Sequence, residues 1–260
     1  MIPNIHSVIC AALATSLITI VSINTATAQV NIYDATLAES NQTTPEISTG
    51  ELRRALADGS AVVIDARKHS EFVAGHIAGA QSTMLEGNLP PAAVVVPVVE
   101  RLVGGDKSKA IVVYCNGPHC PASKKLGEQL VAAGFSNVRR YQLGIPLWRT
   151  LNGPVEIELE GILRVYKIDR TAVFLDARSA KDFSERSLPG TSNVPADHLT
   201  PDELAKAPLP HSDFNTRIVL FGSNGAQARA LADALAKTPF QNVSYFPGTF
   251  NELLAAVKAH

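Results

Sequence analysis

The chain contains little cysteine. Its 260 residues include three, Cys10, Cys115 and Cys120. The sulfurs of Cys115 and Cys120 and the adjacent His119 form an incomplete set of zinc ligands, so we expect no bound metal. Lys and Arg number 23 against 24 Asp and Glu, and the sequence has no dense cluster of basic residues. This balance lacks the electrostatic footprint of a protein that binds nucleic acid or anionic membranes, so we expect neither partner.

Long uninterrupted apolar runs are also missing. Residues 8–23 are mostly apolar and uncharged, but Ser and Thr interrupt them, and the stretch is shorter than the roughly 20 residues that a transmembrane helix needs. Ala26-Thr27-Ala28 then provides a small-residue cleavage pattern before Gln29. We expect residues 1–28 to be a secretory signal peptide, with a membrane anchor as the alternative. The mature protein would then be periplasmic, free of the membrane, with its remaining cysteines in an oxidising compartment.

The most informative stretch is 111–131. The apolar, β-branched run 111–114 predicts a buried strand that ends at Cys115. A loop containing Gly and Pro follows, and helical spacing begins near Pro121, which suits the first position of a helix because it has no backbone N–H. Unpaired N–H groups and the helix dipole favour an anion at that end, so a thiolate or persulfide on Cys115 would be stabilised there.

The same order of landmarks occurs twice along the chain. Asp65 and Asp176 each follow an apolar run, and they are separated by 111 residues, as are Gly79 and Gly190. A shared offset over separated landmarks indicates duplication. Each copy alternates apolar runs with amphipathic stretches, which is typical of a parallel sheet flanked by helices. We therefore predict an α/β protein.

Several motifs resemble the rhodanese (sulfurtransferase) family. In chain order they are Asp65-Ala66-Arg67, Glu71-Phe72, Gly75-His76-Ile77-Ala78-Gly79-Ala80, Val113-Tyr114-Cys115 and Gly144-Ile145-Pro146-Leu147-Trp148. The resemblance implies two rhodanese-like domains, placed at residues 45–150 and 155–260. It also implies a cysteine that carries sulfur as a persulfide, taken from a donor such as thiosulfate and passed to cyanide or a thiol. The expected partners are these small molecules, and no cofactor is expected.

The cysteine loop leaves alternatives open. Cys115 stands at the family's catalytic position, while Cys120 is a second candidate sulfur carrier, a resolving thiol or a disulfide partner. The Gly117 backbone and the His119 side chain are candidates for substrate contacts, although His119 equally suits an exposed position without a role. A phosphatase with a related loop would need Cys-x5-Arg, but the sixth residue after Cys115 is Pro121.

Outside the loop, Arg67 and Trp148 are candidate substrate-binding residues. Each has a structural alternative, because Arg67 could pair with Asp65 and Trp148 could be an ordinary core residue. In the second copy Gly222 stands where the cysteine belongs, so we expect that domain to be inactive and to pack on the first. The competing function is a redox or binding module in which the two loop cysteines act as a thiol pair without transferring sulfur.

Overall fold

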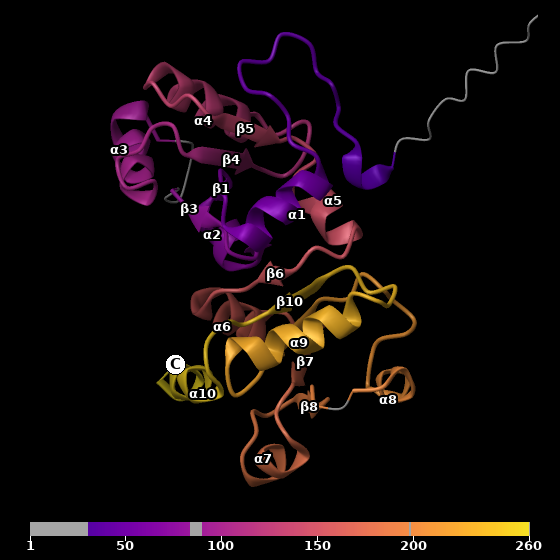
Figure 1. Ribbon diagram of the computed structural model, residues 1–260. Helices are drawn as coiled ribbons and strands as arrows, with labels where there is room; N and C mark the ends of the chain where they lie inside the picture. The colour runs from indigo at the N-terminus through magenta and orange to yellow at the C-terminus, as the bar shows by residue number, and fades with distance from the viewer. Residues whose placement is uncertain (1–30, 84–89, 198, 260) are drawn as a thin grey trace, which may run out of the picture. The chain divides into compact units, whose positions relative to one another are not determined.

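The structure is a computed structural model that describes residues 31–83, 90–197 and 199–259 (Figure 1). The predicted signal peptide, residues 1–28, lies outside the described residues. Within the ranges described, no helix is long and apolar enough to cross a lipid bilayer.

The first lobe, from α1 (Thr49–Asp58) to α5 (Gly144–Thr150), is built on a parallel sheet with the strand order β3-β1-β4-β5. These strands are β1 (Ala61–Asp65), β3 (Gln81–Ser82), β4 (Ala110–Tyr114) and β5 (Val138–Tyr141). In β4, Val112 lies in one apolar cluster and Val113 in another. Because side chains alternate along a strand, both faces of the sheet are buried, as the continuous apolar sequence of β4 predicts.

Helices supply the other half of each apolar cluster. The remaining helices of this lobe are α2 (His69–Val73), α3 (Ala92–Leu102) and α4 (Pro121–Ala132). Val99 of α3 and Leu126 of α4 join the cluster on one face of the sheet, while Leu52 of α1 and Ile145 of α5 join the cluster on the other. The first lobe therefore has three layers, with α4 seated directly after the strand that ends at the cysteine (Figure 1).

The second lobe, from β6 (Val155–Glu156) to α10 (Phe250–Ala259), repeats this arrangement in its strands. Its other strands are β7 (Val173–Asp176), β8 (Thr191–Asn193), β9 (Ile218–Phe221) and β10 (Val243–Tyr245), and its other helices are α6 (Leu159–Ile168), α7 (Ala180–Glu185), α8 (Pro201–Lys206) and α9 (Gly225–Leu235). The order β8-β7-β9-β10 corresponds strand for strand to β3-β1-β4-β5. The predicted α/β class is confirmed, since the strands of each lobe form a parallel arrangement flanked by helices.

A short strand from the first lobe's sequence joins the second sheet. β2 (His76–Ile77) pairs antiparallel with β6, which is itself parallel to β10. The buried His76 ring stacks on Phe72 with ring centroids 3.8 Å apart, and its Nε2 lies 3.4 Å from Glu156 Oε2. The Gly79 N–H donates a 3.2 Å hydrogen bond to the same carboxylate oxygen. The Gly-His-Ile motif of the sequence therefore connects the two lobes.

Candidate active site

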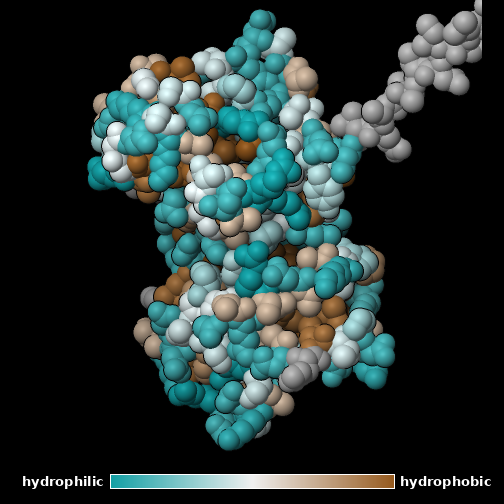
Figure 2. All heavy atoms as spheres, in the orientation of Figure 1, coloured by the Kyte–Doolittle hydropathy of each residue, from teal (hydrophilic) through white to brown (hydrophobic). Residues whose placement is uncertain are grey.

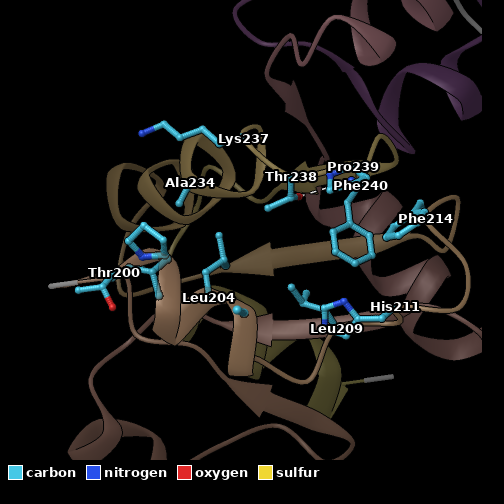
Figure 3. Close-up of a pocket in the computed structure, with 13 residues that line it drawn as sticks. Thr200, Leu204, Leu209, His211, Phe214, Ala234, Lys237, Thr238, Pro239 and Phe240 are labelled. Carbon is cyan, nitrogen blue, oxygen red and sulfur yellow. Dashed lines mark hydrogen bonds between the residues drawn. The ribbon is translucent and has the colours of Figure 1, made fainter.

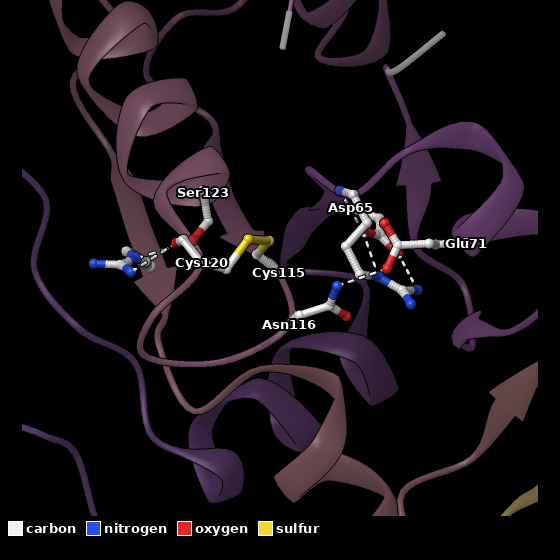
Figure 4. Close-up of a disulfide and its surroundings, with 8 residues drawn as sticks. Asp65, Glu71, Cys115, Asn116, Cys120 and Ser123 are labelled. Atoms are coloured by element: carbon white, nitrogen blue, oxygen red, sulfur yellow. Dashed lines mark hydrogen bonds and ion pairs between the residues drawn. A yellow bond between two sulfur atoms is a disulfide. The ribbon is translucent and has the colours of Figure 1, made fainter. Parts of the chain in front are cut away.

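A loop that carries two cysteines joins β4 to α4 (Figure 4). Cys115 directly follows β4, and Cys120 is the N-cap residue of α4, with Pro121 at the first helical position as predicted. Cys115 and Cys120 form a disulfide in which the Cα atoms are 6.1 Å apart. Cys115 is only 2% exposed, whereas Cys120 is partly exposed. The structure thus brings the two predicted catalytic residues together in their oxidised form.

Backbone contacts hold the loop in place. Gly117 has a φ of +103°, which favours glycine, and its carbonyl accepts a 3.1 Å hydrogen bond from the Cys120 N–H. The Ile145 N–H donates a 3.1 Å hydrogen bond to the Cys115 carbonyl. Gly144, with a φ of +67°, approaches so closely that a Cβ there would collide with the Gly117 backbone and the Cys115 carbonyl. The start of α5 therefore supports the loop.

Two polar side chains on the loop have different surroundings. Asn116 Nδ2 donates a 2.6 Å hydrogen bond to Glu71 Oε1 of α2, and Figure 4 shows Asn116 extending away from Cys120. His119 is exposed. Gly117 and His119, both predicted substrate contacts, thus lie in the same loop as Cys115, and the Asn116–Glu71 contact ties that loop to α2.

A buried arginine that the sequence did not single out lies at the first turn of α4. Arg140 of β5 is 2% exposed, and its Nε donates a 3.0 Å hydrogen bond to Ser123 Oγ. Its Nη2 donates to the Cys120 carbonyl at 3.5 Å, and its Nη1 lies 3.2 Å from Glu39 Oε2. A guanidinium cation beside the positive end of a helix dipole favours a thiolate over a thiol. Because Glu39 pairs with this guanidinium, only part of the positive charge of Arg140 acts at Cys120, in addition to the N-terminus of α4.

Arg67 is fully engaged by neighbouring groups. Its Nη2 lies 2.6 Å from Asp65 Oδ2 and also donates a 2.8 Å hydrogen bond to the Gly75 carbonyl. The Tyr114 hydroxyl donates to Asp65 Oδ2 at 2.6 Å and accepts from the Ile77 N–H at 3.1 Å. Burial, reinforced by the Asp65 charge, raises the pKa of Tyr114 well above its ordinary value. This network packs where β1 and β4 end.

The second lobe contains the same Asp-Arg arrangement without a cysteine. Arg178 Nη2 lies 2.7 Å from Asp176 Oδ2 and donates a 2.6 Å hydrogen bond to the Arg186 carbonyl. The residue after β9 is Gly222, whose carbonyl accepts a 2.9 Å hydrogen bond from the Phe250 N–H, as Cys115 accepts one from Ile145. Since the Asp-Arg pair forms in a lobe that has no thiol at this position, its geometry indicates a structural role at the strand end.

Trp148 lies in the core of the first lobe. It is 1% exposed, its Nε1 donates a 3.0 Å hydrogen bond to the Pro154 carbonyl, and it meets Tyr141 edge to face. It lines a cavity of about 450 Å³ together with Arg53, Gly79, Glu156 and Arg229. None of these contacts is a residue of the cysteine loop. Of the predicted substrate-binding residues, the structure therefore gathers Gly117 and His119 in the loop and places Arg67 and Trp148 in separate surroundings.

An apolar cavity of about 430 Å³ lies in the second lobe near α8 and the end of α9 (Figure 3). Its lining includes Leu204, Leu209, His211 and two edge-to-face rings, Phe214 and Phe240. Figure 2 shows brown, apolar residues exposed in this part of the surface. All of its lining residues belong to the second lobe, so it is a separate feature from the cysteine loop. Across the described ranges, no group of three or more His, Cys, Asp or Glu side chains is placed to hold a metal ion.

Residues 48–151 and 163–256 both match the family described as Rhodanese-like domain. The HTH-type transcriptional regulator Rv0324 of Mycobacterium tuberculosis is 31% identical over 110 residues, which cover 42% of this chain and 44% of that protein. The thiosulfate sulfurtransferase GlpE of Pseudomonas fluorescens is 34% identical over 107 residues, which cover 41% of this chain and 86% of that protein. The crystal structure of BH2092 from Bacillus halodurans is 27% identical, covers 44% of this chain and 77% of its own, and gives a TM-score of 0.37. The chain thus spans less than half the length of the first of these relatives.

Proposed function

Because the chain belongs to the rhodanese-like family, we propose that its first lobe is a sulfurtransferase centre in which Cys115 carries the sulfur. The observation behind this proposal is the position of Cys115, directly after β4 and beside the first turn of α4, in a loop supported by Gly144 and Ile145. A thiolate or persulfide at this place faces the positive end of a helix dipole. The similarity to a protein named thiosulfate sulfurtransferase supports thiosulfate as a donor.

The chemistry begins from the reduced loop. The Cys115 thiolate attacks the outer sulfur of thiosulfate, a new S–S bond forms, and sulfite leaves with the electron pair of the bond that breaks. A thiolate or cyanide acceptor then attacks the terminal sulfur of the persulfide, and Cys115 leaves as a thiolate. The disulfide with Cys120 must be reduced first, because a sulfur engaged in that bond is not a nucleophile.

The second lobe has no part in this bond-making. Its equivalent loop starts with Gly222, which has no side chain to act as a nucleophile. Its contribution is structural, through the pairing of β6 with β2 and the contacts of Glu156 with His76 and Gly79.

We also propose that the protein is exported and acts in the periplasm after residues 1–28 are removed. The cleavage pattern before Gln29 supports this, and the disulfide is a bond that persists in oxidising compartments. The N-terminal sequence of protein recovered from the periplasmic fraction should begin at Gln29. Protein that keeps Met1 and stays with the cytosolic fraction would contradict export.

Sulfur transfer is tested with the Cys120→Ser variant, which cannot form the disulfide. The protein is reduced, freed of reductant and mixed with thiosulfate without oxygen. The Cys115 peptide should gain the mass of one sulfur atom, one equivalent of sulfite should appear, and added cyanide should yield thiocyanate. In this Cys120→Ser background, Cys115→Ser should abolish all three signals, while Ser223→Ala, in the equivalent loop of the second lobe, should leave them unchanged. The absence of any adduct on Cys115 with every sulfane donor tried refutes the proposal.

A thiol-pair redox module is a second candidate, which the Cys115–Cys120 disulfide favours. In that function the disulfide exchanges with the dithiol of another molecule and needs no sulfane sulfur. Reduced wild-type protein distinguishes the two functions: a sulfurtransferase consumes thiosulfate and releases sulfite, whereas a redox module leaves thiosulfate intact.

A further inference from the structure

Both loop cysteines are held by contacts that do not involve their sulfur atoms. The Cys115 carbonyl accepts from the Ile145 N–H at 3.1 Å. The Cys120 N–H donates to the Gly117 carbonyl at 3.1 Å, and the Cys120 carbonyl accepts from Arg140 at 3.5 Å. None of these bonds involves a sulfur atom, so we expect the two thiols to stay close together after reduction.

Once the disulfide is reduced, the Cys120 side chain is available for chemistry. Cys120 is the N-cap residue of α4, but its side chain makes no capping hydrogen bond. The residue is partly exposed and stands at the positive end of α4, where the buried Arg140 guanidinium contacts its carbonyl. These surroundings favour the thiolate, which is the attacking species in thiol exchange.

We propose that Cys120 is a resolving residue that releases the sulfur carried by Cys115 as hydrosulfide. This inference rests on the proposed function, since it requires the Cys115 persulfide. The Cys120 thiolate attacks the inner sulfur, which is Cys115 Sγ. The Cys115–Cys120 bond forms, the bond between the inner and outer sulfur breaks, and hydrosulfide leaves with its electron pair. The product is the disulfide seen in the structure.

The electrons and atoms balance over the two steps. The two cysteine thiols and one thiosulfate dianion give the disulfide, one hydrogen sulfite ion and one hydrosulfide ion. The sulfane sulfur is reduced to sulfide, and the cysteine pair is oxidised by two electrons. A dithiol then reduces the disulfide and becomes a disulfide itself. The centre therefore acts as a sulfide-releasing, dithiol-dependent reductase of sulfane sulfur, and a reaction that supplies reduced dithiol must precede each turnover.

Exposure sets the order of the reducing step. Cys115 is 2% exposed and Cys120 is partly exposed, so the dithiol reaches Cys120 first. The mixed disulfide then forms on Cys120, and Cys115 leaves as the thiolate that the next thiosulfate requires. The reductant thus meets the more exposed of the two cysteines.

A single-turnover experiment tests the proposal. Wild type, Cys120→Ser and the control Ser223→Ala are reduced, desalted and mixed with excess thiosulfate without oxygen; sulfite, sulfide, free thiols and peptide masses are then measured. Wild type and Ser223→Ala should release one equivalent each of sulfite and sulfide and lose both free thiols. Cys120→Ser should release sulfite and retain the extra sulfur on Cys115. It should release sulfide at least about tenfold more slowly than wild type.

The outcomes separate this inference from the proposed function. If wild type keeps a stable persulfide with Cys120 still free, or if Cys120→Ser releases sulfide as fast as wild type, the resolving role is wrong and sulfur transfer stands. If neither protein releases sulfite or gains sulfur on Cys115, both ideas fail together. A circular dichroism melt of each variant shows that the comparison is made between folded proteins.

Discussion

The Tyr114 hydroxyl donates a 2.6 Å hydrogen bond to Asp65 Oδ2, which ties the last residue of β4 to the last residue of β1 directly before the cysteine loop. The two residues are also register partners in the sheet. In the second lobe the equivalent partner of Asp176 is Phe221, which has no hydroxyl. The first lobe therefore has a side-chain hydrogen bond between the ends of β1 and β4. The second lobe cannot form this bond, because Phe221 has no hydroxyl.

Tyr114→Phe should destabilise the protein by about 1–3 kcal/mol, because it removes the donor to Asp65 and leaves the buried Ile77 N–H without the acceptor it has in the structure. The free energy of unfolding from urea titrations measures this loss. Tyr33→Phe, at a residue that is 36% exposed, is the matched control and should change stability little. Equal losses in the two variants would show that the buried tie contributes nothing of its own.

Gly144→Ala should be more harmful than the same change at another glycine with positive φ. Gly59 has a φ of +66° and nothing within 4 Å of an added Cβ, whereas Gly144 has a φ of +67° and would collide with the loop backbone. We expect a loss of about 1 kcal/mol for Gly59→Ala and about 2–4 kcal/mol for Gly144→Ala. Thermal and urea unfolding measure both. Similar losses would mean that the loop backbone moves aside at little cost.

The fold was predictable because each copy repeats the same local signals. An apolar run followed by Asp-Ala-Arg marks β1 and β7, and the shared offset of the landmarks marks the duplication. The α4 start was also predictable, since Pro121 suits the first helical position and the apolar strand stops at Cys115. These features depend on residues that are close in sequence.

Features that depend on distant residues were not predictable. Arg140 contacts Cys120 across 20 residues and Glu39 across 101 residues, and no sequence spacing specifies either contact. A pair of arginines within an otherwise apolar strand, at 139–140, is the signal that could have drawn attention to it, because a charged residue in a buried strand needs partners. The entry of β2 into the second sheet is long-range in the same way.

The pairing of the two cysteines stayed open for a geometric reason. A separation of five residues permits a disulfide only if the backbone brings the Cβ atoms together, and here the turn at Gly117 and the support from Gly144 do so. Likewise, Arg67 remained undecided between Asp65 and a substrate until its hydrogen-bond partners were known.

Arg140→Gln should slow the reaction of reduced Cys120 with a thiol-alkylating reagent at neutral pH. The reason is that the guanidinium, which contacts the Cys120 carbonyl, stabilises the thiolate by its charge. The measurement uses the Cys115→Ser background so that one loop thiol reacts, and the rate should fall several-fold. Arg140→Lys should retain more of the rate, and Arg139→Gln, which removes the neighbouring charge, serves as control. An unchanged rate in Arg140→Gln would show that Arg140 does not stabilise the Cys120 thiolate.

Glu156 should make the stability of the protein depend on acid pH. Its carboxylate accepts from the Tyr245 hydroxyl at 2.7 Å and the Gly79 N–H at 3.2 Å, and His76 Nε2 lies 3.4 Å away. Burial raises the pKa of Glu156, but these three partners outweigh it and hold the pKa below the ordinary value of 4.5. A lowered pKa in the folded state means that the unfolded chain binds the proton more readily, so the stabilisation is present above pH 4.5 and is lost as the pH falls through the folded-state value.

Urea titrations from pH 7 downward should therefore show a steeper loss of stability below pH 4.5 in wild type than in Glu156→Gln, while the exposed control Glu185→Gln should follow wild type. Parallel curves for wild type and Glu156→Gln would mean that this carboxylate does not couple protonation to folding.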